Sequence, residues 1–196
     1  MKEFELVNRL NNTFQNKMVL YANEIRMGVG IPDIMTTSEY RKEFIPIDDY
    51  YVLLIYQELI RKNINTTSDL LDLVPLKKDK LKSILNHLTE KRIILIEGSK
   101  IKITLLFDFN NIPKTTSIEV KINDWINGFY QAKRYLLFSD YSYLAIYESF
   151  IKNVDLKILS SEGIGLISIG NDTASVLLEA KKSKICHSIY KYIAFS

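Results

Sequence analysis

A single cysteine, Cys186, is present among the 196 residues, and this excludes an internal disulfide bond. One unpaired cysteine is usual in a reducing compartment, so we expect a cytoplasmic protein. No apolar run approaches the roughly 20 residues needed to cross a bilayer, so we expect no membrane partner. Residues 1–5 are acidic and amphipathic and have no signal-peptide character. These absences leave the soluble classes of protein.

Histidine is scarce as well, and neither of the two histidines forms a convincing site. His87 lies beside Leu85 and Leu88 in an apolar helical pattern, so it is read as a surface or half-buried residue rather than a metal ligand. Cys186 and His187 are adjacent, and neighbouring side chains on a helix point about 100° apart. They therefore do not form a nucleophile–base pair, and Cys186 is read as structural.

Neither sign of charge is in strong excess. The sequence has 26 Lys and Arg against 23 Asp and Glu, which gives a net charge of +3 and a pI of about 8.7. This mild basicity is compatible with a nucleic-acid partner but does not by itself argue for one. The hydrophobic fraction of 47% and the charged fraction of 25% are those of an ordinary globular protein.

The two ends of the chain, residues 1–43 and 108–196, show the alternating helix and strand patterns of an α/β (α+β) domain. We expect a mixed sheet flanked by helices, interrupted by an insertion at a surface loop. The expected helices are 3–14, 124–138, a helical stretch at 148–156 and 183–194. The expected strands are 18–21, 31–36, 117–122, 142–147, 164–169 and 174–179.

Residues 44–107 differ in kind, because three helices are followed by a hairpin. Asp48 or Asp49 is a suitable cap for the first helix, and the second begins at 66–68. The third spans 77–91, and strands 93–96 and 101–105 flank a turn at 97–100. This order resembles a winged helix-turn-helix, with the third helix as recognition helix and the turn as the wing tip.

Lysines gather on the third helix and on the wing of this insertion. They favour contact with DNA phosphates, and the plain alternative is a solvated helix face. A winged helix can also serve as a protein-interaction module. The lysines expected to contact DNA are Lys77, Lys78, Lys80, Lys82, Lys100 and Lys102.

The most informative stretch is Glu119-Val120-Lys121, inside an apolar run. Side chains alternate along a strand, so Glu119 and Lys121 project from one face while Val120 faces the core. Charges removed from water are costly unless they are paired or bound to a metal. Asp33 begins a second short apolar strand. Two carboxylates and a lysine that converge would form a divalent-metal site for cutting a phosphodiester.

These residues resemble the PD-(D/E)XK, or restriction-endonuclease-like, nuclease superfamily. Pro32-Asp33 matches the first half of its motif, and Glu119-Val120-Lys121 matches the second. In the family the two halves usually lie close together in the sequence, whereas the insertion separates them here. The insertion accounts for that gap without moving the two strands apart in space.

The resemblance implies a role for each matching residue. Asp33 and Glu119, with the backbone carbonyl of Val120, would bind Mg²⁺ (or Mn²⁺), which prefers oxygen ligands and retains waters. Lys121 would orient or help to deprotonate the attacking water and offset the negative charge that develops.

A second signature lies on the next expected helix, where Gln131 and Tyr135 match the Gln-x-x-x-Tyr pattern of recombination-repair helicase–nucleases. By this resemblance Gln131 would position the metal-site strand or contact the DNA backbone, with Tyr135 beside it. The alternative is a packed polar–aromatic pair. The family often adds a glutamate on the first helix, for which Glu5 is the candidate, and Glu24 is another candidate acid.

Plainer interpretations remain open for the first three residues. Asp33 after Pro32 is also the pattern of a turn cap. Glu119 and Lys121 could instead form an ion pair on an exposed edge strand.

Taken together, the sequence predicts a metal-dependent DNA endonuclease that engages double-stranded DNA through its insertion. One such centre cuts one strand, so a double-strand cut would favour a homodimer. The first alternative is a catalytically inactive DNA-binding or regulatory protein of the same fold. The second is a protein-interaction module in which the acidic pair is incidental.

Overall fold

The chain divides into two compact units. The sheet unit comprises residues 1–44 and 112–195, and the three-helix unit comprises residues 45–111. The sequence predicted boundaries after residues 43 and 107. The computed structural model describes residues 2–14, 20–23, 30–37, 49–106 and 112–195.

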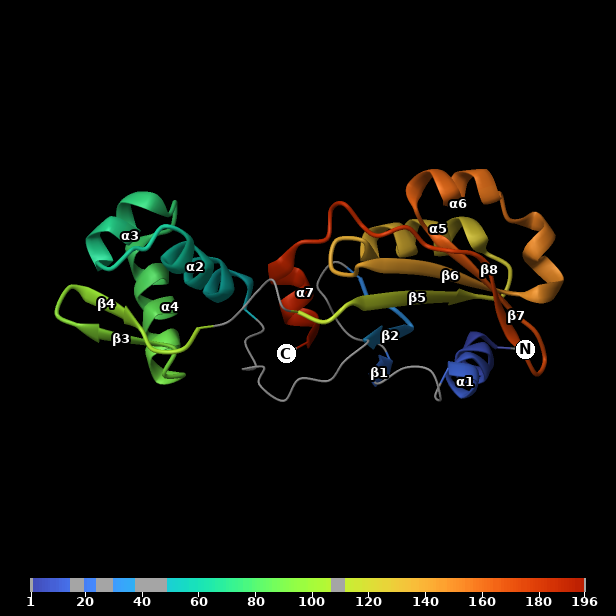
Figure 1. Ribbon diagram of the computed structural model, residues 1–196, viewed down its shortest axis with the longest axis horizontal. Coiled ribbons are helices and arrows are strands. Elements are labelled where there is room, and N and C mark those ends of the chain that lie inside the picture. The colour runs from blue at the N-terminus through green and yellow to red at the C-terminus, as the bar shows by residue number, and fades with distance from the viewer. Residues whose placement is uncertain (1, 15–19, 24–29, 38–48, 107–111, 196) are drawn as a thin grey trace. The chain divides into compact units, whose positions relative to one another are not determined.

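Six strands of the sheet unit form one mixed sheet (Figure 1): β1 (Leu20–Asn23), β2 (Ile34–Thr37), β5 (Thr115–Lys121), β6 (Tyr141–Tyr147), β7 (Gly165–Ile169) and β8 (Ala174–Leu178). Their order is β1-β2-β5-β6-β7-β8. β5, β6 and β7 are parallel, while β2 joins β5, β1 joins β2 and β8 joins β7 in antiparallel pairs. The mixed α/β class predicted from the sequence is therefore correct.

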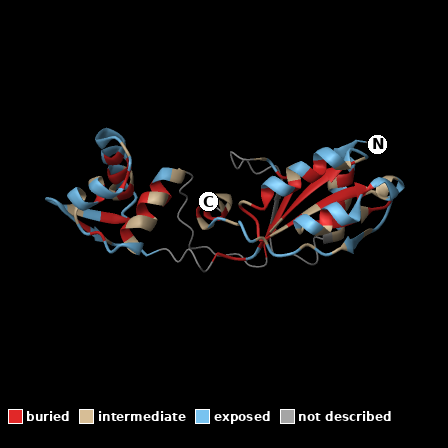
Figure 2. Cartoon of the chain, turned by 90° about the horizontal axis from the view of Figure 1, so that it is seen from above, coloured by how far each residue is buried: buried red, intermediate tan, exposed pale blue. Residues whose placement is uncertain are grey.

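Helices cover both faces of this sheet: α1 (Glu3–Phe14), α5 (Trp125–Tyr135), the 3₁₀ helix η2 (Glu148–Asn153), α6 (Leu156–Glu162) and α7 (Ser188–Phe195). α5 and α6 pack on one face and α1 on the other (Figure 1). The central strands β5, β6 and β7 are largely buried, as Figure 2 shows, because parallel strands covered on both sides have little contact with water. β5 is thus an interior strand of a covered sheet.

The structure differs most from the prediction at two helical stretches. The helical stretch expected at 148–156 is the 3₁₀ helix η2 followed by a separate helix, α6. The Asp155 side chain accepts hydrogen bonds from the first turn of α6, and Gly163 ends it at a φ of 77°. This left-handed conformation favours glycine, so the sequence marked both ends of α6.

The last helix begins at residue 188 rather than 183. The preceding segment is held to the sheet unit instead, because Ser183 N donates to Asp140 O and His187 N donates to Leu137 O. Helix α7 then packs its apolar residues Tyr190, Ile193 and Ala194 against Met35, Tyr135 and Phe138.

A buried ion pair fastens α7 to the sheet. Lys191 Nζ donates to Asp140 Oδ2 at 2.5 Å and to Ile112 O at 3.3 Å. The same Asp140 oxygen accepts from the backbone N–H of Thr115 at 2.8 Å, so β5, β6 and α7 meet at one carboxylate. Lys191 and Asp140 are only 8% and 6% exposed.

Cys186 is expected to react slowly with thiol reagents. Burial and the charge of Asp140 raise the pKa of this thiol to about 11. At pH 8 its thiolate population, and hence its rate with a disulfide reagent, should be about 100-fold lower than in the unfolded chain. The measurement compares folded and urea-unfolded protein, and no second cysteine contributes a background. Equal rates in the two states would contradict this placement of Cys186.

The three-helix unit contains α2 (Tyr50–Arg61), α3 (Thr67–Leu73) and α4 (Lys78–Glu90), followed by the hairpin of β3 (Ile94–Glu97) and β4 (Lys100–Ile103). Asp49 caps α2 by accepting from Tyr51 N and Val52 N. The hairpin is tied to the segment before α3, because Ile101 N donates to Asn65 O and Thr67 N donates to Ser99 O. The core is apolar and includes Leu53, Ile55, Leu59, Leu70, Ile84 and Leu88.

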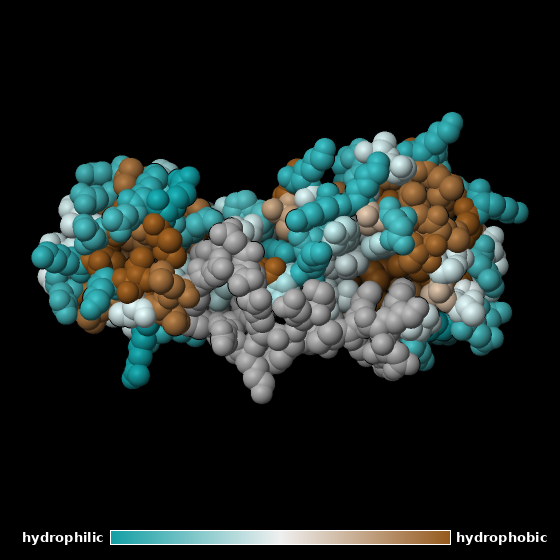
Figure 3. Space-filling view, viewed as in Figure 1, coloured by the Kyte–Doolittle hydropathy of each residue, from teal (hydrophilic) through white to brown (hydrophobic). Residues whose placement is uncertain are grey.

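On the face shown in Figure 3, each unit has a patch of apolar side chains bordered by hydrophilic ones. Among the described residues no helix combines the length and the apolar character needed to span a bilayer.

Candidate functional site

Asp33 and Glu119 meet because β2 lies antiparallel beside β5. Ile34 pairs with Ile118, so continuing this register by one residue places Asp33 opposite Glu119. Asp33 Oδ2 accepts a hydrogen bond of 2.7 Å from the backbone N–H of Val120, 87 positions away. The two predicted half-motifs are therefore in direct contact at the end of β5.

Glu119 is almost completely enclosed, with 1% of its surface exposed. Lys121 Nζ donates to Oε1 at 2.6 Å, and the Tyr135 hydroxyl donates to Oε2 at 2.6 Å. Ile118 and Val120 point to the opposite face, into the cluster beneath α1. The interpretation as an exposed ion pair on an edge strand is wrong, because β5 lies between β2 and β6.

Lys121 is 9% exposed and has further oxygen neighbours. Its Nζ donates to the carbonyl of Val120 at 3.2 Å and lies 3.6 Å from Glu3 Oε2. α5 passes close by, since a side chain at Gly128 would lie 2.8 Å from Lys121 Cγ. The amine is thus held at the end of β5 between three oxygen-bearing groups.

The first-helix acid that lies beside Lys121 in the structure is Glu3, whereas the sequence analysis named Glu5. Glu5 instead accepts from the backbone N–H of Lys2. The signal was the apolar spacing of α1, because Glu3 lies three and seven residues before the buried Leu6 and Leu10 and shares their face. Glu24, the other candidate acid, lies outside the described residues.

Tyr135 links the two halves of the site. Its hydroxyl lies 2.9 Å from the carbonyl of Ile31 and 2.6 Å from Glu119 Oε2. With both acceptors within reach, the one hydroxyl ties the strand that carries Glu119 to the segment before Asp33. Gly30 makes the approach possible, because a Cβ there would lie 2.6 Å from Tyr135 Cε1.

Gln131, one turn before Tyr135, does not find an equivalent partner. Its Oε1 atom is buried and accepts no hydrogen bond within the described part of the chain. An orphaned buried acceptor costs about 1–3 kcal/mol, so it favours a role for a donor that approaches from outside the protein.

Burial and neighbouring charges shift the pKa values of Glu119, Lys121 and Tyr135. Burial, and then the negative charge of Asp33, raise the pKa of Glu119 against the opposing effects of Lys121 and Tyr135. Burial alone would lower the pKa of Lys121, but the hydrogen bond and charge of Glu119 raise it overall. Burial and the bond to Glu119 also raise the pKa of Tyr135.

The oxygen ligands that the site can offer a metal are Asp33, Glu119 and the carbonyl of Val120. These are hard ligands of the type that Mg²⁺ prefers. The two carboxylates repel each other, and a bound divalent cation would relieve that repulsion. The donor set therefore fits such an ion. Within the described ranges, however, no group of three or more His, Cys, Asp and Glu side chains is arranged to hold a metal.

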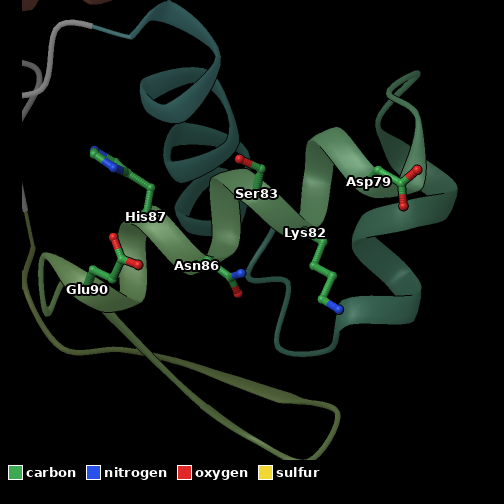
Figure 4. A pocket seen from close by; sticks show the side chains of 6 residues that line it. All are labelled: Asp79, Lys82, Ser83, Asn86, His87 and Glu90. Atoms are coloured by element: carbon green, nitrogen blue, oxygen red, sulfur yellow. The ribbon is translucent and has the colours of Figure 1, made fainter.

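A second surface of interest is the solvent-facing stripe of α4. A hollow runs along it and is lined by Asp79, Lys82, Ser83, Asn86, His87 and Glu90 (Figure 4). Reasoning from charge alone found Lys82 but missed Ser83 and Asn86, which can hydrogen-bond to base edges. His87 is half-buried there, as the sequence predicted.

The other five lysines expected to contact DNA do not line this hollow. Lys80 lies 3.9 Å from Asp49 and over the ring of Tyr51, so it is partly engaged within the unit. The remaining four are exposed at the start of α4 or on β4, namely Lys77, Lys78, Lys100 and Lys102.

Comparison of the chain with protein-family models, with curated proteins and with solved structures finds no match.

Proposed function

We propose that the sheet unit is a metal-dependent endodeoxyribonuclease of the restriction-endonuclease-like type. The observation that carries this is the contact of Asp33 with the Glu119-Val120-Lys121 segment, which joins two residue sets 87 positions apart. If the ion pair of Glu119 and Lys121 were only structural, it would not need Asp33, whose negative charge raises the pKa of Glu119.

The residues divide the chemistry among them. Asp33, Glu119 and the Val120 carbonyl would hold Mg²⁺ or Mn²⁺, which supplies an activated water and neutralises charge on the phosphate. Lys121 holds its amine beside the same carbonyl and offsets the charge that develops on the phosphoryl oxygens. Tyr135 keeps Glu119 and the segment before Asp33 in register.

The three-helix unit would hold duplex DNA as a winged helix. The exposed Lys77, Lys78, Lys100 and Lys102 would contact phosphates, while Lys82 and Asn86 of the α4 hollow would reach base edges. A magnesium-dependent cut in a duplex would then require both units.

Supercoiled plasmid incubated with the full chain and Mg²⁺ or Mn²⁺ tests this function. Wild-type protein should convert the plasmid to open-circular or linear forms, and EDTA should stop the reaction. Asp33→Asn and Glu119→Gln should each lower the rate by about 100-fold or more, because each removes a charged metal ligand. Asp172→Asn removes an exposed carboxylate of the same unit and should cut at the wild-type rate. Cleavage that survives either site substitution would overturn the proposal.

A second candidate is a nucleic-acid-binding protein that does not cut. It is favoured by one observation, that both carboxylate oxygens of Glu119 already have internal partners. Such a protein would bind duplex DNA with strong salt dependence in EDTA and leave the plasmid intact with every metal.

A further inference from the structure

The exposed face of α5 carries large side chains where a surface helix would normally be polar. Ile126 is 55% exposed and Tyr130 is 60% exposed, and Arg134 is exposed one turn further on. These three residues are spaced by four, so they form one row along the helix. We call Ile126, Tyr130 and Arg134 the α5 row.

The α5 row lies next to the candidate site on the same helix. Gln131 and Tyr135 follow Tyr130 and Arg134 directly, and Tyr135 bonds to Glu119. The opposite flank of α5 faces α6, because Lys133 pairs with Glu162 at 2.9 Å. The α5 row therefore stands between the flank that contacts the site and the flank that contacts α6.

The charges of the candidate site and of α5 indicate which kind of ligand the α5 row suits. Glu3, Asp33 and Glu119 outnumber Lys121 at the site, so an incoming phosphodiester needs another cation nearby. Lys133 is already paired, whereas Arg134 has no ion-pair partner among the described residues. Arg134 is thus the available cation of α5, and its planar fork suits a phosphate.

Proteins that bind single-stranded nucleic acid use an exposed aromatic ring beside an available guanidinium. Bases stack on the ring, and the backbone follows the positive charge. In a duplex the base faces are already stacked on one another, so the ring of Tyr130 gains little from intact double helix.

We propose that the α5 row binds a single-stranded nucleic-acid segment beside the candidate site, with a base on Tyr130 and a phosphate on Arg134. The inference rests on the proposed nuclease function, and it narrows the substrate to nucleic acid with an unpaired segment at the cut. Ile126 packs beside the stacked base and keeps water from it.

The test is binding of labelled oligothymidylate to the full chain in EDTA, followed by fluorescence anisotropy. Tyr130→Ala and Arg134→Gln should each weaken binding about 10-fold, and Tyr130→Phe should bind as wild type because it keeps the ring. Arg134→Gln should also reduce the slope of log affinity against log salt by about 0.7. Oligouridylate, titrated in parallel, shows whether the segment is DNA, RNA or either.

Two comparisons make the result specific. Lys133→Gln removes the same charge from the adjacent position and should leave the affinity within about twofold, since Lys133 faces α6. A blunt duplex should lose little affinity on Tyr130→Ala. The inference would be overturned if the wild-type protein does not bind single strands, or if the variants bind them as tightly as the wild type does. Because no metal is present, that failure is distinct from failure to cut plasmid.

Discussion

Lys121→Met is expected to lower plasmid cleavage by about 100- to 1000-fold. Methionine keeps the apolar stem beside Gly128 but removes the amine that donates to Glu119 and to the carbonyl of Val120. Among the described residues, Lys121 is the one cation that forms an ion pair with Glu119. The rate is measured on supercoiled plasmid with Mg²⁺.

The same substitution should make stability depend on pH. Glu119, which is 1% exposed, loses its ionic partner, so its pKa should rise further above the ordinary value of 4.5. A carboxyl whose folded pKa is raised favours folding at low pH and loses that contribution as pH increases through the folded pKa. Urea unfolding should therefore show a larger deficit at pH 8 than at pH 5.

Lys157→Met, at an exposed position of α6, is the matched control for both measurements. It should cut at the wild-type rate and show no such pH dependence. An equal deficit for Lys121→Met at both pH values would mean that Glu119 does not take up a proton when its partner is removed.

Lys191→Met is expected to destabilise the protein by about 3–5 kcal/mol. The substitution leaves Asp140 buried without its cation, although Thr115 still donates to the same oxygen. Chemical denaturation measures the loss. The double variant Lys191→Met with Asp140→Asn should recover most of it, because the uncompensated charge is gone while an acceptor for Thr115 remains.

Lys133→Met provides the comparison for this prediction. It breaks the exposed pair with Glu162 in the same unit and should cost less than about 1 kcal/mol. A similar loss of stability for Lys133→Met and Lys191→Met would show that the contribution of the Lys191–Asp140 pair does not depend on its burial.

The sequence predicted the strand that carries the site but not its surroundings. The alternation of Glu119 and Lys121 with apolar neighbours is a local pattern, so strand and facing could both be derived from it. That β5 lies inside the sheet, with β2 on one side and β6 on the other, is a long-range property. No local pattern excluded an exposed edge strand.

The partners of Tyr135 show the same limit more sharply. The spacing to Gln131 was visible, but the bonds to Ile31 and Glu119 depend on where α5 crosses the sheet. At Gly30, only the nearby ring of Tyr135 shows why a side chain is excluded. In contrast, the ends of α6 follow from local sequence, because Asp155 is a typical N-cap residue and Gly163 a typical C-terminal glycine.

The pairing of Thr37 with Thr115 has a consequence for how such chains are recognised. These two residues face each other across neighbouring strands, so a tight turn of a few residues could join them in place of everything between. The shortened polypeptide would read as a simple hairpin carrying an aspartate on one arm and a glutamate and lysine on the other. A large sequence separation between two acidic half-motifs is therefore a poor reason to reject them as one site. A whole folded unit can be inserted at the turn between two strands without changing how those strands pair.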